Sequence, residues 1–238
     1  NEALLKSIRT IHQESRQTYG SPRVYRELKA EGVVVSRVRV AKLMRDNGIV
    51  AKMKRRFKVT TVVNSTASVT PNILMQNFTA SRPNEKWVHD ITDIWTREGW
   101  LYLAAIMDLF SRKIIGMAMS SSLETDIVIQ ALQQALGRRD RSGDLIHHSD
   151  KGCQYTSYAF RNCIQQAHIT PSFSGTGRCY DNAAMESFFH TLKTEHVYFE
   201  TYPTRAAAEA SLFEYVEVFY NNHRRHSTID YCSPSEFE

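Results

Sequence analysis

The sequence predicts two structural parts, a small all-helical unit followed by a larger α/β domain in which helices cover a mixed sheet. Apolar residues recur at helical spacing through the first fifty residues, whereas the later pattern starts with strands and then alternates helices with strands. Residues 59–84 are rich in Ser, Thr and Asn, which is typical of a linker, and Leu74 and Phe78 within it are expected to dock on the second domain. We therefore expect domains at residues 1–58 and 85–238.

Composition excludes several classes of protein. Hydrophobic residues make up 42% of the 238 residues, which is enough for a core and too many for a disordered chain. The sequence contains no run of about 18 apolar residues and no signal-peptide pattern, so neither a membrane span nor secretion is expected. The four cysteines form no Cys-x-x-Cys pair, which argues against a zinc knuckle and predicts reduced thiols in a cytoplasmic protein.

The first quarter of the chain is strongly basic. Residues 1–60 hold 15 of the 30 Lys and Arg residues but only 5 of the 25 Asp and Glu residues, so the rest of the chain is mildly acidic. This uneven charge predicts a nucleic-acid-binding unit attached to a body with another role. A solvated basic face without a ligand is the alternative.

Three helices are predicted in this basic unit. The first covers residues 3–17, the second runs from a cap at Ser21 to Gly32, and the third runs from a cap at Ser36 to Gly48. A helix, a short turn and a basic helix are typical of a helix-turn-helix, although a helical dimerisation unit would look similar. The cations expected to contact DNA are Arg37, Arg39, Lys42, Arg45, Lys54, Arg55 and Arg56.

The second domain is expected to contain a mixed sheet covered by helices. Its predicted strands are residues 87–95, 100–107, 113–119, 144–148 and 168–173. Its predicted helices are residues 123–136, 157–167, 181–197 and 204–222. The three tryptophans, Trp87, Trp95 and Trp100, are expected in the core.

Three carboxylates stand where acidic side chains are unusual. Asp90 lies inside a strand, Asp150 directly after one, and Glu186 in the first turns of a helix beside apolar residues. Any one of them alone could be a surface residue, but together they form the oxygen-ligand set that divalent cations need. Two cations about 3.5–4 Å apart can activate a nucleophile and stabilise a leaving oxygen in phosphodiester chemistry. Two Asp residues on neighbouring strands, about 4.8 Å apart, can share one cation.

Five segments of the sequence resemble insertion-sequence transposases of the OrfB type, which have a retroviral-integrase-like catalytic core. They are residues 87–92 (Trp-Val-His-Asp-Ile-Thr), 148–157, 179–189, 192–195 and 220–227. Asp150 and Glu186 have 35 residues between them, which is the spacing that marks this family. The resemblance extends from about Tyr19 to Pro234.

The resemblance implies an RNase H-like fold and a triad of Asp90, Asp150 and Glu186 that binds two Mg²⁺ or Mn²⁺ ions. It implies nicking at the ends of an insertion sequence, followed by attack of the freed 3′-OH on another strand. The expected partners are terminal inverted repeats and target DNA, further copies of the chain, and a first-frame (OrfA) segment. Further DNA contacts are expected from Lys151, Arg178, Asn182 and Lys193.

Two other functions stay open at this point. A nuclease of the same fold would hydrolyse DNA without joining strands, and an inactive remnant would only bind DNA. One departure from the family pattern is Asp93, which strand alternation places opposite Asp90 and away from the metals. The remaining polar residues are expected to have other roles: Asp108 in a turn, His147 and His148 in structural contacts, and Arg224 and Arg225 on DNA or covering the body.

Overall fold

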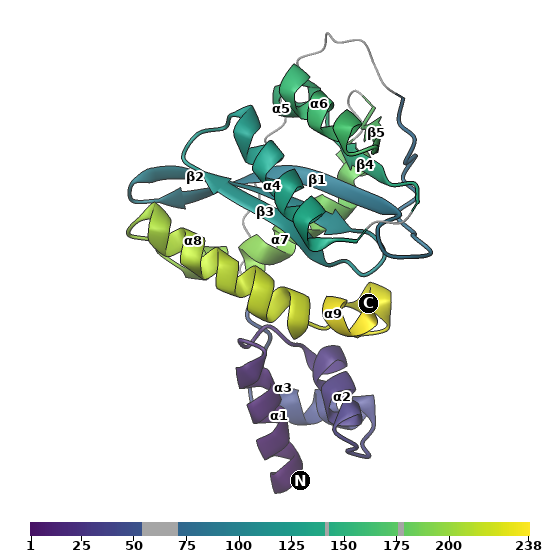
Figure 1. Ribbon diagram of the computed structural model, residues 1–238. Coiled ribbons are helices and arrows are strands. Elements are labelled where there is room, and N and C mark those ends of the chain that lie inside the picture. The colour runs from purple at the N-terminus through teal and green to yellow at the C-terminus, as the bar shows by residue number, and fades with distance from the viewer. Residues whose placement is uncertain (54–70, 141–142, 176–178) are drawn as a thin grey trace.

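The computed structural model describes residues 1–53, 71–140, 143–175 and 179–238. A five-stranded sheet lies at the centre with helices on both faces, and a three-helix head at the N-terminus lies next to the helical layer that contains α8 (Figure 1). Within the described ranges, no helix is long and apolar enough to cross a membrane.

The head, residues 1–53, contains α1 (Glu2–Glu14), α2 (Ser21–Ala30) and α3 (Arg37–Asp46). The predicted cap of α3 is confirmed, because the Ser36 hydroxyl accepts a hydrogen bond of 3.3 Å from the Arg39 N–H. The predicted cap at Ser21 is wrong. Gly20 takes the extended N-cap conformation, and Ser21 is already the first helical residue, followed by Pro22.

The sheet contains β1 (Lys86–Thr96), β2 (Gly99–Asp108), β3 (Ile114–Ser120), β4 (Ile146–Ser149) and β5 (Thr170–Phe173), in the order β3-β2-β1-β4-β5. The first three strands pair antiparallel, whereas β4 and β5 run parallel to β1. This arrangement confirms the predicted mixed sheet. β1 pairs with β4 only at residues 86–88, so the rest of β1 has a free edge on that side.

Helices cover both faces of the sheet (Figure 1). One face packs against α4 (Thr125–Arg138), α5 (Cys153–Thr156) and α6 (Tyr158–Gln166), and the other against α7 (Ala183–Glu195) and α8 (Arg205–Phe213). α4 approaches β3 closely, since a Cβ at Gly116 would lie 2.3 Å from the Ala131 carbonyl oxygen and only glycine fits there. The remaining elements are η1 (Cys179–Asn182), η2 (Val197–Phe199), the π-helical η3 (Glu214–Tyr220), η4 (Ser227–Ile229) and α9 (Pro234–Phe237).

The head is packed into the body and shares a core with it. Ile8 and Val24 of the head belong to the same buried cluster as Met185 of α7 and Leu212 of α8. Leu74 is buried in that cluster as the sequence predicts, and Phe78 packs against it. The head and α7 therefore share one hydrophobic cluster.

One prediction about the core is wrong. Trp87 is fully buried, but the side chains of Trp95 and Trp100 are 60% and 45% exposed. They face each other across the β1–β2 pair, with ring centroids 4.9 Å apart. The reason is geometric, because α4 packs on the middle of β2 and β3, and the end of the long β1–β2 hairpin extends beyond it (Figure 1).

Candidate active site

The first two candidate carboxylates come from neighbouring parallel strands. The last paired residues of β1 and β4 are Val88 and His148. Asp90 and Asp150 each lie two residues beyond this pair, at the point where the two strands separate. The sheet therefore brings together two carboxylates that are far apart in the sequence, as the sequence analysis anticipated.

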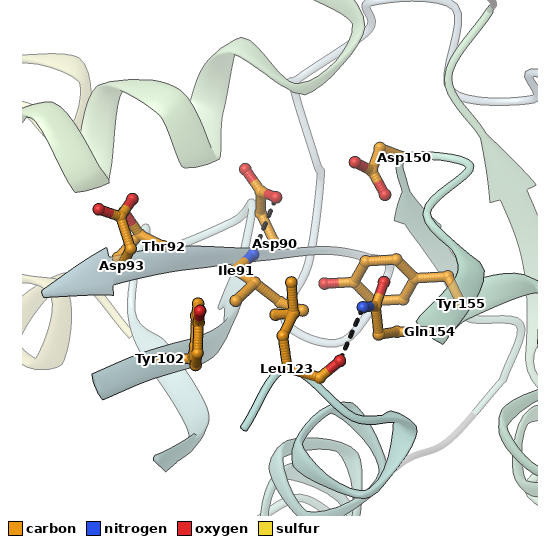
Figure 2. Close-up of a pocket in the computed structure, with 9 residues that line it drawn as sticks. All are labelled: Asp90, Ile91, Thr92, Asp93, Tyr102, Leu123, Asp150, Gln154 and Tyr155. Carbon is orange, nitrogen blue, oxygen red and sulfur yellow. Dashed lines mark hydrogen bonds between the residues drawn. The ribbon is translucent and has the colours of Figure 1, made fainter. Parts of the chain in front are cut away.

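Local hydrogen bonds hold both carboxylates in place. One Asp90 oxygen, Oδ1, accepts a bond of 2.8 Å from the Ile91 N–H. Asp150 Oδ1 accepts one of 2.9 Å from the Gly152 N–H, which closes a tight turn after β4. Gly152 suits this turn, since a Cβ there would lie 3.0 Å from Asp150 Oδ1. Both carboxylates keep oxygen atoms directed away from these bonds, toward the pocket described below (Figure 2).

The third carboxylate, Glu186, is exposed in the first turn of α7. The opposite side of this helix is fixed to the sheet by its buried residues Met185, Phe188, Phe189 and Leu192. Before the helix, the buried Asp181 accepts hydrogen bonds from the Asn72 and Gln76 side chains at 2.8 and 2.9 Å and from the Gly175 N–H at 2.7 Å. The position of Glu186 is therefore fixed by the packing of α7 on the sheet and by the hydrogen bonds of Asp181 before the helix.

A pocket of about 230 Å³ follows the free edge of β1. Figure 2 shows Asp90 and Asp150 on either side of it, with Tyr155 and Gln154 of α5 below them. The pocket is also lined by Ile91, Thr92, Asp93, Tyr102 and Leu123. The sequence analysis assigned no role to Tyr155, although it lies in a family motif, because nothing in a sequence places α5 under the carboxylates.

Burial disfavours the ionised forms of the three candidate carboxylates, and repulsion adds to this effect at Asp90. Burial and the neighbouring negative charge of Asp150, with a smaller effect of Glu186, raise the pKa of Asp90 to about 8. Burial also raises the pKa of Asp150 and of Glu186. Within the described ranges, no three His, Cys, Asp or Glu side chains lie close enough together to hold a metal ion as they stand.

Three buried histidines lie behind the carboxylates and are neutral. His89 Nδ1 and His147 Nε2 are 3.2 Å apart, and His148 bonds the hydroxyls of Ser172 and Ser174 at 2.8 and 3.1 Å. Burial lowers the pKa of His147 to about 3 and that of His148 to about 4, and that of His89 falls well below its usual value. These contacts agree with the structural role predicted for His147 and His148.

The prediction for Asp93 needs correction. Strand alternation places it opposite Asp90, but both carboxylates line the same pocket (Figure 2). The pocket follows the strand edge, so residues of both faces reach it. Lys193 of α7 forms an ion pair of 3.3 Å with Asp93, and its charge also acts on Asp90. The lysine that the sequence assigns to DNA is therefore held at the rim of the pocket.

The other predicted DNA contacts have different placements. Arg37, Arg39, Lys42 and Arg45 are exposed on α3. Arg39 bonds the Asn1 side chain at 2.6 Å, and Arg45 lies 3.8 Å from Asp46. Lys151 is half-buried beside Asp150. Lys54, Arg55, Arg56 and Arg178 lie outside the described residues.

Asn182 is buried, and its side-chain amide donates to the His89 carbonyl oxygen at 3.3 Å. This placement favours fixing the start of α7 against β1 over the direct DNA contact predicted from the sequence.

Two further expectations concern charged residues away from the pocket. Asp108 is buried and accepts bonds from the Asn84 and Phe110 N–H groups at 2.8 and 3.0 Å, which confirms its turn role. Arg224 is buried against Glu195, and Arg225 is paired with Glu27 of the head. The sequence left these arginines either on DNA or covering the body, and their ion pairs within the protein support the second role.

Comparison with known proteins decides the family. Residues 1–57 match the HTH-like domain, and residues 80–179 and 186–238 each match an integrase core domain. The insertion element IS600 uncharacterized 31 kDa protein of Shigella sonnei is 40% identical, with 100% of this chain and 87% of the relative covered. Transposase InsF for insertion sequence IS3A of Escherichia coli (strain K12) is 42% identical, with 94% and 78% covered. This chain belongs to the insertion-sequence transposase family.

The fold of this transposase also has a counterpart among solved structures. The simian T-cell lymphotropic virus intasome in complex with PP2A regulatory subunit B56 gamma contains a chain that matches with a TM-score of 0.54 at 14% identity, covering 96% of this chain and 73% of that one. At this identity the likeness concerns the fold alone. The predicted RNase H-like domain, preceded by a helix-turn-helix-like head, is confirmed.

Proposed function

We propose that this transposase cuts DNA at the ends of an insertion sequence and joins the freed 3′-OH to another strand, with Asp90, Asp150 and Glu186 binding two Mg²⁺ or Mn²⁺ ions. The observation that supports this most is the matched position of Asp90 and Asp150 on neighbouring parallel strands. Their carboxylate oxygens are the hard ligands that these cations prefer. Membership of the transposase family supports the same chemistry.

The charges in the pocket fit a divalent cation. Negative charge from Asp150 and Glu186 acts on the Asp90 carboxyl, and nearby positive charge from Lys193 offsets only part of it. When bound, such cations activate an oxygen nucleophile and stabilise the leaving oxygen. Asp90 and Asp150 would hold the cations from the sheet, and Glu186 would complete the set from α7.

DNA binding is assigned to the exposed cations of α3 and to Lys193 at the rim of the pocket. Each phosphate contact releases counterions, so binding should fall steeply with salt. The two ends of an element must be brought together, so we expect several copies of the chain on DNA. Because the head shares a core with the body, deleting it would expose apolar surface, and the double variant Lys42→Gln/Arg45→Gln is the cleaner test.

The test of the catalytic assignment is a nicking and strand-transfer assay on labelled DNA ends with Mg²⁺ or Mn²⁺. Asp90→Asn, Asp150→Asn and Glu186→Gln should each abolish both products while DNA binding persists. Asp126→Asn, at an exposed carboxylate of α4, is the matched control and should keep wild-type activity. Near-normal nicking by Asp90→Asn would refute the triad. Nicked DNA without joined product would indicate a nuclease, and no product from the wild type would indicate an inactive remnant.

A further inference from the structure

A buried tyrosine hydroxyl lies at the pocket without a protein partner. Tyr155 of α5 lines the pocket, and its side chain is 2% exposed. Among the described residues, no group forms a hydrogen bond with its hydroxyl. Leaving a buried hydroxyl unpaired is unfavourable, so such groups are rare in folded proteins and need an explanation.

Six buried side-chain atoms have no hydrogen-bond partner among the described residues, and three of them, including the Tyr155 hydroxyl, lie near the carboxylates. His89 Nε2 and Asn182 Oδ1 are also buried without partners among the described groups. His89 precedes Asp90, and Asn182 bonds the His89 carbonyl oxygen. Three unpaired polar atoms therefore lie on Tyr155 or on residues in contact with the segment that carries Asp90, and each such group needs an explanation.

The ring of Tyr155 is held firmly. It meets the His89 ring edge-on, with centroids 4.9 Å apart, and the Phe160 ring at 5.5 Å. Figure 2 shows the ring lying below the Asp90 and Asp150 side chains, with its hydroxyl directed toward β1. The hydroxyl cannot turn elsewhere without disturbing this packing.

The chemistry of the neighbouring groups selects the acceptor. Burial raises the pKa of Tyr155, and the charges of Asp90 and Asp150 raise it further, so the phenol keeps its proton at neutral pH. Carboxylates only accept hydrogen bonds, and a protonated phenol can donate one. Of the two His89 ring nitrogens, Nδ1 is engaged with His147, and Nε2 has no partner among the described residues, which leaves it as the competing acceptor.

We propose that Tyr155 is a positioning residue of this active site, whose hydroxyl would donate its one hydrogen bond to a carboxylate oxygen of the Asp90–Asp150 pair when these residues bind a divalent cation. This inference rests on the proposed function. A partner that orients a metal-binding carboxylate usually changes metal affinity or activity about 10- to 100-fold when it is removed. Without a bound cation the Tyr155 hydroxyl has no hydrogen-bond partner among the described residues, so its removal should not lower the stability of the fold.

The test is Tyr155→Phe, which keeps the ring and removes only the hydroxyl. We expect an unchanged melting temperature, Mn²⁺ binding weakened about 10-fold in a calorimetric titration, and kcat for end cleavage reduced about 10-fold or more with an unchanged KM for DNA. Tyr202→Phe is the control, because Tyr202 is a buried tyrosine that does not line the pocket. It should match the wild type in all three measurements.

Wild-type Mn²⁺ affinity and kcat in Tyr155→Phe would overturn the inference. A loss of Mn²⁺ affinity and kcat together with a clear drop in melting temperature would also overturn it, since this result would indicate that the hydroxyl supports the fold. If the wild-type protein neither binds Mn²⁺ nor cuts DNA, the proposed function fails instead.

Discussion

The two ends of helix α7 differ in how the negative charge near them is compensated. At its last residue, Glu195 receives a two-pronged ion pair from Arg224, with Nε–Oε2 and Nη2–Oε1 distances of 2.8 and 2.7 Å. Tyr215 donates to the same carboxylate at 3.3 Å, and Arg23 of the head lies 3.5 Å from it. Burial acts to raise the pKa of Glu195, but the paired arginine outweighs it and the pKa is lowered.

At the first turn of the helix, charge is left without such compensation. Burial and the charges of Asp150 and, to a smaller extent, Glu186 raise the pKa of Asp90 to about 8. Among the described residues, Lys193 is the cation whose charge lowers the pKa of Asp90, and its ion pair is with Asp93. The C-terminal end of α7 therefore contributes to stability, whereas the uncompensated negative charge near its N-terminal end favours a cationic ligand.

The largest expected effect on stability is at the C-terminal end of α7, where Glu195 is paired. Arg224→Met would leave the Glu195 charge buried and unpaired, which should reduce the free energy of unfolding by about 3–5 kcal/mol. The melting temperature should fall by roughly 10 °C. Arg138→Met breaks the exposed pair with Glu217 and serves as the control, with a loss below about 1 kcal/mol. Equal effects of the two substitutions in urea unfolding would contradict the comparison.

The pH dependence of stability should report the same ion pair. Because folding lowers the pKa of Glu195, its contribution is present above the unfolded value of about 4.3 and is lost as pH falls through the folded value. We expect the wild type to lose about 1–2 kcal/mol relative to Glu195→Gln/Arg224→Met between pH 7 and pH 3. Urea unfolding of both proteins across this range measures the difference. A constant difference would show that Glu195 has an unshifted pKa.

At the N-terminal end of α7, replacing the Asp90 carboxyl should stabilise the protein. In chelator, Asp90→Asn should raise the free energy of unfolding by about 1 kcal/mol and the melting temperature by roughly 2–4 °C, because burial and the charge of Asp150 make the Asp90 carboxyl take up a proton on folding and an amide does not need one. Added Mg²⁺ should then raise the melting temperature of the wild type but not that of the variant. Asp126→Asn should behave like the wild type. A destabilised Asp90→Asn would mean that the carboxylate supports the fold.

The smallest expected effects concern the ion pair between Lys193 and Asp93. Its partners are 21% and 54% exposed, so breaking it should change stability by less than about 1 kcal/mol. Lys193→Ala should weaken binding of the specific DNA end, whereas Asp93→Asn should strengthen it a few-fold by releasing the lysine. Fluorescence anisotropy at limiting DNA concentration measures both. Unchanged binding in both variants would make Lys193 an ordinary surface lysine.

Much of this molecule follows from local sequence patterns. The strands around Asp90 and before Asp150 and the cap at Ser36 depend on neighbouring residues, and the structure confirms them. The fold class also follows, because helices and strands alternate in the order that a mixed sheet requires. The adjacency of Asp90 and Asp150 was anticipated from the strand pattern and the family resemblance.

The rest depends on contacts between distant segments. The sequence leaves Arg224 either on DNA or covering the body, and only the fold shows that it pairs with the buried Glu195. Trp95 and Trp100 have the composition of core residues, but the length of the hairpin relative to α4 exposes them. Tyr155 lies in a recognisable motif, yet its unpaired hydroxyl becomes evident only when α5 packs beside the carboxylates.

The pairing of β1 with β4 also sets the order in which the protein becomes competent during synthesis. The head and the β1–β2–β3 meander leave the ribosome first, because translation proceeds from the N-terminus. Asp150 follows only after α4, and Glu186 later still. A nascent chain therefore displays its basic head before its carboxylates can assemble. Premature termination before α7 would release a product without Glu186, so truncated copies would lack one of the three carboxylates proposed to bind metal.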